Sequence, residues 1–171
     1  MKLKNGIEFA EPNDNLCDTY IKKAENALKA VSALKGNKEW EISSSYYAMY
    51  FALYAVMMKI GVKCENHSCS ISFMKEYLGE KFEKDEPDFL RKSMRARVDA
   101  QYYSNRGIAD EFYQKMLKDA PLFLVRCKGI INSIKQEEIN QIRKKLEKVK
   151  GHCYLNLKTY LFSKHNFLQR K

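Results

Sequence analysis

Glycine and proline are scarce in this chain, whose 171 residues include 7 Gly and 3 Pro. An all-β fold needs many turns, and turns are where these two residues are most used, so their scarcity argues against a sheet protein. Long apolar runs are missing as well, because no stretch reaches the roughly 18 residues that a membrane helix needs. The first twelve residues are polar and charged and contain no apolar signal core. We therefore expect a cytoplasmic protein without a membrane span.

The signatures of several site types are also absent. Five Cys is an odd number and the spacing is not that of a small disulfide scaffold, which favours reduced thiols. No glycine-rich phosphate loop occurs. Cys64, His67 and Cys69 lie close in sequence and His152 or Cys153 could add a ligand, but no Cys-x-x-Cys pair of the kind common in zinc sites accompanies them. We therefore expect no metal and no cofactor, and His67 should order its loop or cap the next helix.

What the chain does contain is helical periodicity, because apolar residues recur at three- and four-residue steps. The pattern predicts helices over 13–34, 39–60, about 71–78, 87–104 and 109–134, and a charged helical stretch over 136–150. We expect a loop over 62–70 and a kink or break near Lys118, because Pro121 lies inside the fifth helix. Expected helix-end residues are Asn13 or Asp14, Gly61, and Ser68 or Ser70.

The second of these helices is apolar on all sides. Fourteen of its fifteen positions from Tyr46 to Ile60 are apolar, the exception being Lys59. Such a helix must be covered on more than one side, so we expect it inside a bundle and also in a subunit interface. Four or five antiparallel helices with short connections predict an all-α, up-and-down antiparallel bundle.

Charge divides the chain into a predicted bundle over 1–131 and a basic extension over 132–171. The extension holds ten Lys or Arg and three Glu, a net charge of +7, whereas the remainder has a net charge of +3. A concentration of positive charge attracts polyanions such as RNA, although the same residues could simply be a solvated surface. Aromatic residues between the lysines of the tail would suit either stacking with single-stranded nucleic acid or docking on the bundle.

Three segments together resemble the HEPN-domain family. The run from Ser43 to Ala52, SSSYYAMYFA, is similar to a Tyr-Tyr-Ala-Met-Phe signature on an inner helix of that family. Gly61, the Asn-His-Ser loop that begins at Asn66, and Phe73 are similar to its next segment. The run from Arg97 to Tyr103, RVDAQYY, resembles the Arg-x-x-Ala-Asp-Tyr region of small prokaryotic members. The resemblance covers roughly residues 15–131.

This resemblance implies a helical bundle that dimerises. In many members it implies metal-independent ribonuclease activity, and in others pairing with a minimal nucleotidyltransferase in toxin–antitoxin-like modules. The nuclease members carry an Arg followed about five to seven residues later by a His. In this chain Tyr102 stands at that distance from Arg97, and no His lies between His67 and His152. Tyr is a poor base at neutral pH, so we expect binding rather than ordinary cleavage.

The candidate site lies on the helix over 87–104. Arg97 could hold a phosphate with two hydrogen bonds, and Tyr102 or Tyr103 could stack on a base or donate a hydroxyl. The alternative is that Arg95 and Asp99 form a surface ion pair and that the tyrosines belong to the core. The catalytic candidates are Arg97, Asp99 and Tyr102. The candidates for nucleotide or RNA binding are Arg95, Arg97, Gln101, Tyr103 and Arg106.

Three functions remain open on these residues. The first is a homodimeric module that recognises RNA or nucleotide and acts with a partner such as a minimal nucleotidyltransferase, in a toxin–antitoxin-like or defence role. The second is a metal-independent ribonuclease that uses Arg97 with Tyr102 or Tyr103. The third is a structural helical dimer. The missing His favours the first over the second, and the basic extension favours the first over the third.

Overall fold

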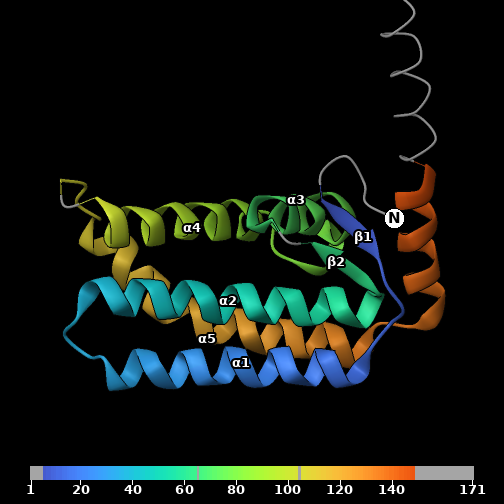
Figure 1. Ribbon diagram of the computed structural model, residues 1–171, viewed down its shortest axis with the longest axis horizontal. Helices are drawn as coiled ribbons and strands as arrows, with labels where there is room; N and C mark the ends of the chain where they lie inside the picture. Colours follow the sequence, from blue (N-terminus) through green and yellow to red (C-terminus); the bar gives the residue numbers. More distant parts are fainter. Residues whose placement is uncertain (1–5, 65, 104, 149–171) are drawn as a thin grey trace, which may run out of the picture. The chain divides into compact units, whose positions relative to one another are not determined.

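A computed structural model of the protein describes residues 6–64, 66–103 and 105–148. The elements run in the order β1 (Ile7–Phe9), α1 (Asp14–Ala33), α2 (Lys38–Ile60), β2 (Val62–Cys64), α3 (His67–Tyr77), the short 3-10 helix η1 (Gly79–Lys81), α4 (Glu86–Tyr102) and α5 (Asp110–Ser133) (Figure 1). The chain divides into two compact units, residues 1–133 and 134–171. A further helix spans 136–148 in the second unit. Within the described ranges, no helix combines the length and apolar character that a membrane span requires.

The first unit is an antiparallel helical bundle built around α2. This helix packs against α1, α5 and α4, and Figure 1 shows it lying between α1 and α4. Ile42, Met49, Leu53 and Met57 of α2 have no exposed surface, and burial of each such side chain stabilises the fold by about 1.5–3 kcal/mol. The all-α bundle is therefore confirmed. Most of α2 is buried by helices of its own chain, whereas its expected place in a subunit interface stays a prediction.

Asparagine side chains begin two of the helices, and a glycine ends another. The Asn13 carboxamide oxygen accepts a hydrogen bond from the Leu16 amide at 2.8 Å and begins α1. Gly61 ends α2 with a φ of 77°, a left-handed conformation that favours glycine. The expectation for α3 was wrong, because its cap is neither Ser68 nor Ser70. The Asn66 side chain accepts from the amides of Ser68 and Cys69 at 2.9 and 3.3 Å.

A small antiparallel sheet is the part of the fold that the sequence did not predict. Strand β1 pairs with β2 so that Ile7 lies opposite Cys64 and Phe9 opposite Val62. The loop expected over 62–70 is therefore wrong, since β2 and the start of α3 occupy most of it. Strands of three residues are too short for an alternating pattern to stand out, and their pairing joins segments far apart in sequence.

Of the kink or break expected near Lys118, the break is wrong, because α5 continues through Pro121. Proline removes one backbone donor, which leaves a carbonyl one turn earlier without its helical partner. Pro121 lies on the exposed side of α5, where water can satisfy that carbonyl, whereas Ala120 and Leu124 are buried. Burial of the opposite face therefore keeps the helix intact.

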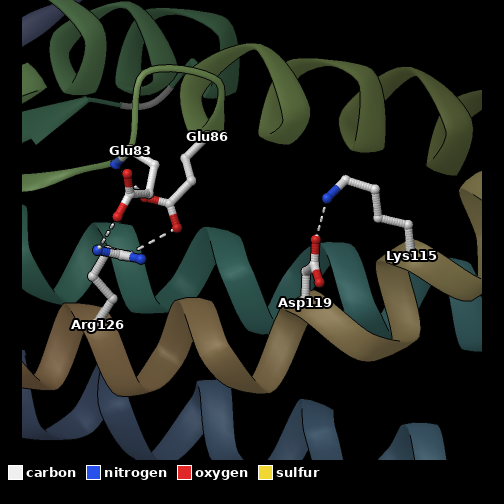
Figure 2. Close-up of polar contacts among 5 residues, drawn as sticks. All are labelled: Glu83, Glu86, Lys115, Asp119 and Arg126. Carbon is white, nitrogen blue, oxygen red and sulfur yellow. Dashed lines mark hydrogen bonds and ion pairs between the residues drawn. The ribbon is translucent and has the colours of Figure 1, made fainter.

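Ion pairs join α5 to the beginning of α4. The Arg126 guanidinium lies 3.0 Å from the Glu86 carboxylate and 3.2 Å from that of Glu83, as Figure 2 shows, and Lys115 pairs with Asp119 one turn away on α5 itself. Exposed ion pairs contribute only about 0–1 kcal/mol each. The two pairs of Arg126 therefore add little stability, but they link α5 to the start of α4, the helix that carries Arg97.

Candidate functional site

Arg97 on α4 is the centre of the candidate site. It is half-buried, its Nη2 donates a hydrogen bond to the Tyr47 hydroxyl at 2.9 Å, and its guanidinium carbon lies 5.3 Å from the Tyr47 ring centroid and 5.6 Å from that of Tyr102. Its Nε atom is buried and has no hydrogen-bond partner among the described residues. A buried donor without an acceptor is costly. Because Nε is buried, an anionic ligand would reach it only after neighbouring side chains move, and phosphate oxygens suit guanidinium geometry.

His67, the first residue of α3, lies beside the same tyrosines of α2. Its Nδ1 atom is 2.6 Å from the Tyr46 hydroxyl oxygen, and its ring stacks on Tyr50 with 3.8 Å between centroids. The Tyr47 and His67 rings are nearly perpendicular, with 6.4 Å between their centroids. The site is therefore assembled from three helices: α2 provides the tyrosines, α3 the imidazole and α4 the guanidinium.

Burial and charge perturb the titration of this cluster. Burial lowers the pKa of His67 below its usual 6.5, and the nearby Arg97 cation lowers it further. The imidazole is therefore neutral near pH 7. Burial raises the pKa of Tyr50 to about 12 and that of Tyr46 higher still, so both phenols keep their protons. The cluster thus presents one cation and one neutral, titratable base in a half-buried setting.

The bond between Tyr46 and His67 decides what the other ring nitrogen can do. When Nδ1 carries the hydrogen and donates it to the Tyr46 oxygen, Nε2 has a free lone pair and is basic. When the Tyr46 hydroxyl donates to Nδ1, the hydrogen is on Nε2, which can then donate to a phosphate oxygen. The first form suits proton abstraction and the second suits anion binding.

Comparison with known families identifies the protein class. The family model described as "HEPN domain" matches residues 18–130, which run from α1 to α5 and include both His67 and Arg97. The chain belongs to the HEPN family. No curated protein matches the chain. The resemblance inferred from the segments on α2 and α4 is thereby confirmed, and the site described above lies within the matched HEPN region.

The predicted site residues of this HEPN domain do not all come together. Arg97 and Tyr102 lie side by side. The Arg95–Asp99 ion pair considered from the spacing is not formed: Asp99 pairs with Arg106 at 2.7 Å instead. The alternative that both tyrosines belong to the core is likewise wrong, because Tyr102 is 67% exposed and Tyr103 43%. Within the described ranges, Arg95 and Gln101 make no hydrogen bond to the cluster; Arg95 is exposed and Gln101 half-buried.

His67 was not predicted as a site residue, because the family pattern places the histidine on the same helix as Arg97. His67 precedes Arg97 by thirty residues and reaches it only because α3 packs on α4. Sequence reasoning also missed Tyr46 and Tyr47 as polar partners, having treated them as core residues. Their hydroxyls on an otherwise apolar helix were the available signal, since a buried Tyr hydroxyl usually finds a hydrogen-bond partner.

The cysteines near His67 do not complete a metal centre in the described part of the chain. No group of three or more His, Cys, Asp or Glu side chains converges there, and His67 contacts tyrosines. Burial, together with a hydrogen bond to the Cys64 thiol, raises the pKa of the Cys69 thiol to about 12. His152, Cys153 and the aromatic residues predicted to stack or dock in the tail lie outside the described residues.

Proposed function

We propose that this HEPN domain binds RNA at the Arg97–His67 cluster and cleaves it without a metal. The observation that carries the proposal is the meeting of a guanidinium that has an unpartnered buried Nε with an imidazole whose pKa is lowered. Phosphate binding needs the first group and proton transfer at neutral pH needs the second. The sequence argument against cleavage was the lack of a His near Arg97, and His67 removes that argument.

The proposed reaction is transfer of the phosphodiester to the neighbouring 2′-oxygen. Nε2 of neutral His67 takes the proton of the 2′-hydroxyl, and the 2′-oxygen forms a bond to phosphorus. The bond from phosphorus to the 5′-oxygen then breaks, and water protonates the leaving oxygen. Arg97 binds the non-bridging oxygens, whose charge grows in the transition state. The products are a 2′,3′-cyclic phosphate and a 5′-hydroxyl, after which His67 returns its proton to solvent.

A second candidate is RNA or nucleotide binding without turnover. The half-burial of His67 favours it, because limited access would hinder proton abstraction from a 2′-hydroxyl. In this case the tautomer with hydrogen on Nε2 donates to phosphate, and Arg97 supplies the charge. The affinity for RNA would then fall as the salt concentration rises, as expected for phosphate contacts.

Cleavage of end-labelled single-stranded RNA in excess chelator separates the two candidates. The ribonuclease proposal expects cleavage with a 2′,3′-cyclic phosphate end, resistance of a strand with 2′-deoxy sugars, and a loss of at least about a hundredfold in His67→Ala. Arg97→Gln should weaken both binding and cleavage, whereas Lys29→Gln, at an exposed position on α1, is the control and should retain cleavage. Cleavage that disappears with chelator, or persists in His67→Ala, would refute the proposed chemistry. Binding without cleavage would favour the second candidate.

Assembly is a further part of this proposal. Leu122 and Val125 lie three residues apart on α5 and are 59% and 66% exposed, which suits a subunit interface in a homodimer. Light scattering of the pure protein tests the dimer, with Leu122→Asp as the disrupting variant. A minimal nucleotidyltransferase partner, in a toxin–antitoxin-like or defence setting, is tested by co-expression with such a protein and purification of the complex. If the chain elutes without the co-expressed nucleotidyltransferase, the proposed pairing is contradicted.

A further inference from the structure

Two neighbouring aromatic side chains are exposed where α4 ends. Tyr102 is the last residue of α4 and Tyr103 is its C-cap, and they are 67% and 43% exposed. Large apolar side chains are rarely left in water without a function when they adjoin one another. Tyr102 also adjoins the proposed phosphate site, because the Arg97 guanidinium carbon lies 5.6 Å from its ring centroid.

We infer that Tyr102 and Tyr103 form a base-stacking subsite beside Arg97, so that the preferred ligand is single-stranded RNA with unpaired bases. This inference rests on the proposed function, since it assumes that Arg97 binds the phosphate of the same strand. A base in a duplex is already stacked on its neighbours, whereas an unpaired base can place its face on an aromatic ring.

Contacts around Tyr103 hold its ring in a suitable orientation. The Arg106 guanidinium carbon lies 3.8 Å from the ring centroid, so one face of the ring is covered by a cation. Arg106 is held in turn by its ion pair with Asp99, and the Tyr103 amide donates to the Asp99 carbonyl at 3.1 Å. This small network restrains the tyrosine before any ligand arrives, which lowers the entropy lost on binding. The face opposite Arg106 is the one that a base would contact.

Cationic residues continue from this subsite along α4. Lys92 and Arg95 are exposed, and Arg95 lies two helical turns before Tyr102, on the same side of the helix. In the described residues neither forms an ion pair, so both charges are free to meet phosphates of a strand that follows α4. The combination of a cationic track and stacking rings is typical of surfaces that bind single strands. A protein partner would need apolar surface beyond the two rings, and Lys92 and Arg95 do not supply it.

Stacking is measured by comparing strands with and without bases. The probes are a 2′-O-methyl single strand, which resists cleavage, the same strand with abasic positions, and its duplex. The full-length protein should bind the base-containing strand at least about fivefold more tightly than the abasic strand or the duplex, the effect of one modest stack. Tyr102→Leu and Tyr103→Leu should reduce that ratio, whereas Tyr102→Phe should keep it. Trp40→Leu is the control for an exposed aromatic residue elsewhere.

The outcomes separate this inference from the proposed function. Arg97→Gln should weaken both single strands alike, because it removes a phosphate contact and leaves stacking. Equal affinity for base-containing and abasic strands, with Arg97→Gln still weakening both, would overturn the stacking subsite and leave the phosphate site standing. A Leu variant that becomes smaller by light scattering would also overturn it, since the tyrosines would then be an interface between two copies of the chain. If the wild-type protein binds none of the RNA probes, both proposals are refuted.

Discussion

The hydrogen bond between Tyr46 and His67 can be tested by Tyr46→Phe, which removes one oxygen atom. Tyr46 has no exposed surface, and its hydroxyl lies 2.6 Å from Nδ1 of half-buried His67. The phenyl ring keeps the packing, so the loss is that of one hydrogen bond and of a partner for Nδ1. Such losses cost about 1–2 kcal/mol when solvent can partly replace the partner. We expect the free energy of unfolding to fall by that amount.

Trp40 provides the assay, because it is the only tryptophan and lies in the first turn of α2. Urea unfolding followed by its fluorescence reports on the bundle. Tyr77→Phe is the matched control: Tyr77 is half-buried against Phe73, and its hydroxyl makes no hydrogen bond with a described residue. In a His67→Ala background, Tyr46→Phe should cost much less, because the partner is already gone. Equal costs in the two backgrounds, or a cost no larger than that of Tyr77→Phe, would refute the bond as a source of stability.

Other substitutions test the core, the histidine and the cap. Leu53→Ala, at a position with no exposed surface on α2, should reduce the free energy of unfolding by about 2–5 kcal/mol in the same urea assay, and a smaller loss would mean that α2 is not central. Because the pKa of folded His67 is lowered below 6.5, the unfolded chain binds the proton more readily. The stabilisation is therefore complete above pH 6.5 and is lost as pH falls through the lowered pKa, and His67→Asn should remove this part of the pH profile. Asn66→Ala should cost about 0.5–2 kcal/mol, because it removes the acceptor at the start of α3, and Asn66→Asp should restore most of it. If Asn66→Ala is as stable as the wild type, the cap does not contribute and packing alone stabilises α3.

Local sequence patterns predicted the helices well because helical periodicity depends on neighbours a few residues apart. The spacing of apolar side chains marked α1, α2, α4 and α5, and Asn13 and Gly61 mark helix ends by short-range chemistry. The uninterrupted apolar run on α2 predicted an inner helix of a bundle, and the structure covers it with α1, α5 and α4. Together with the segment on α4, that run was sufficient to predict the HEPN family.

The sequence by itself therefore determined the helical class, the buried helix and the presence of Arg97 on an adjacent helix. Only the tertiary structure decided which groups meet Arg97. His67 lies near Arg97 although it belongs to another helix. The Tyr47 hydroxyl accepts a hydrogen bond from Arg97 although the two residues are fifty positions apart in the sequence. Asp99 forms its ion pair with Arg106 and not with Arg95. The pairing of β1 with β2 was decided in the same way. Helix formation follows from contacts within one turn, whereas a site between helices depends on how whole elements pack, and one-dimensional spacing carries no record of that packing.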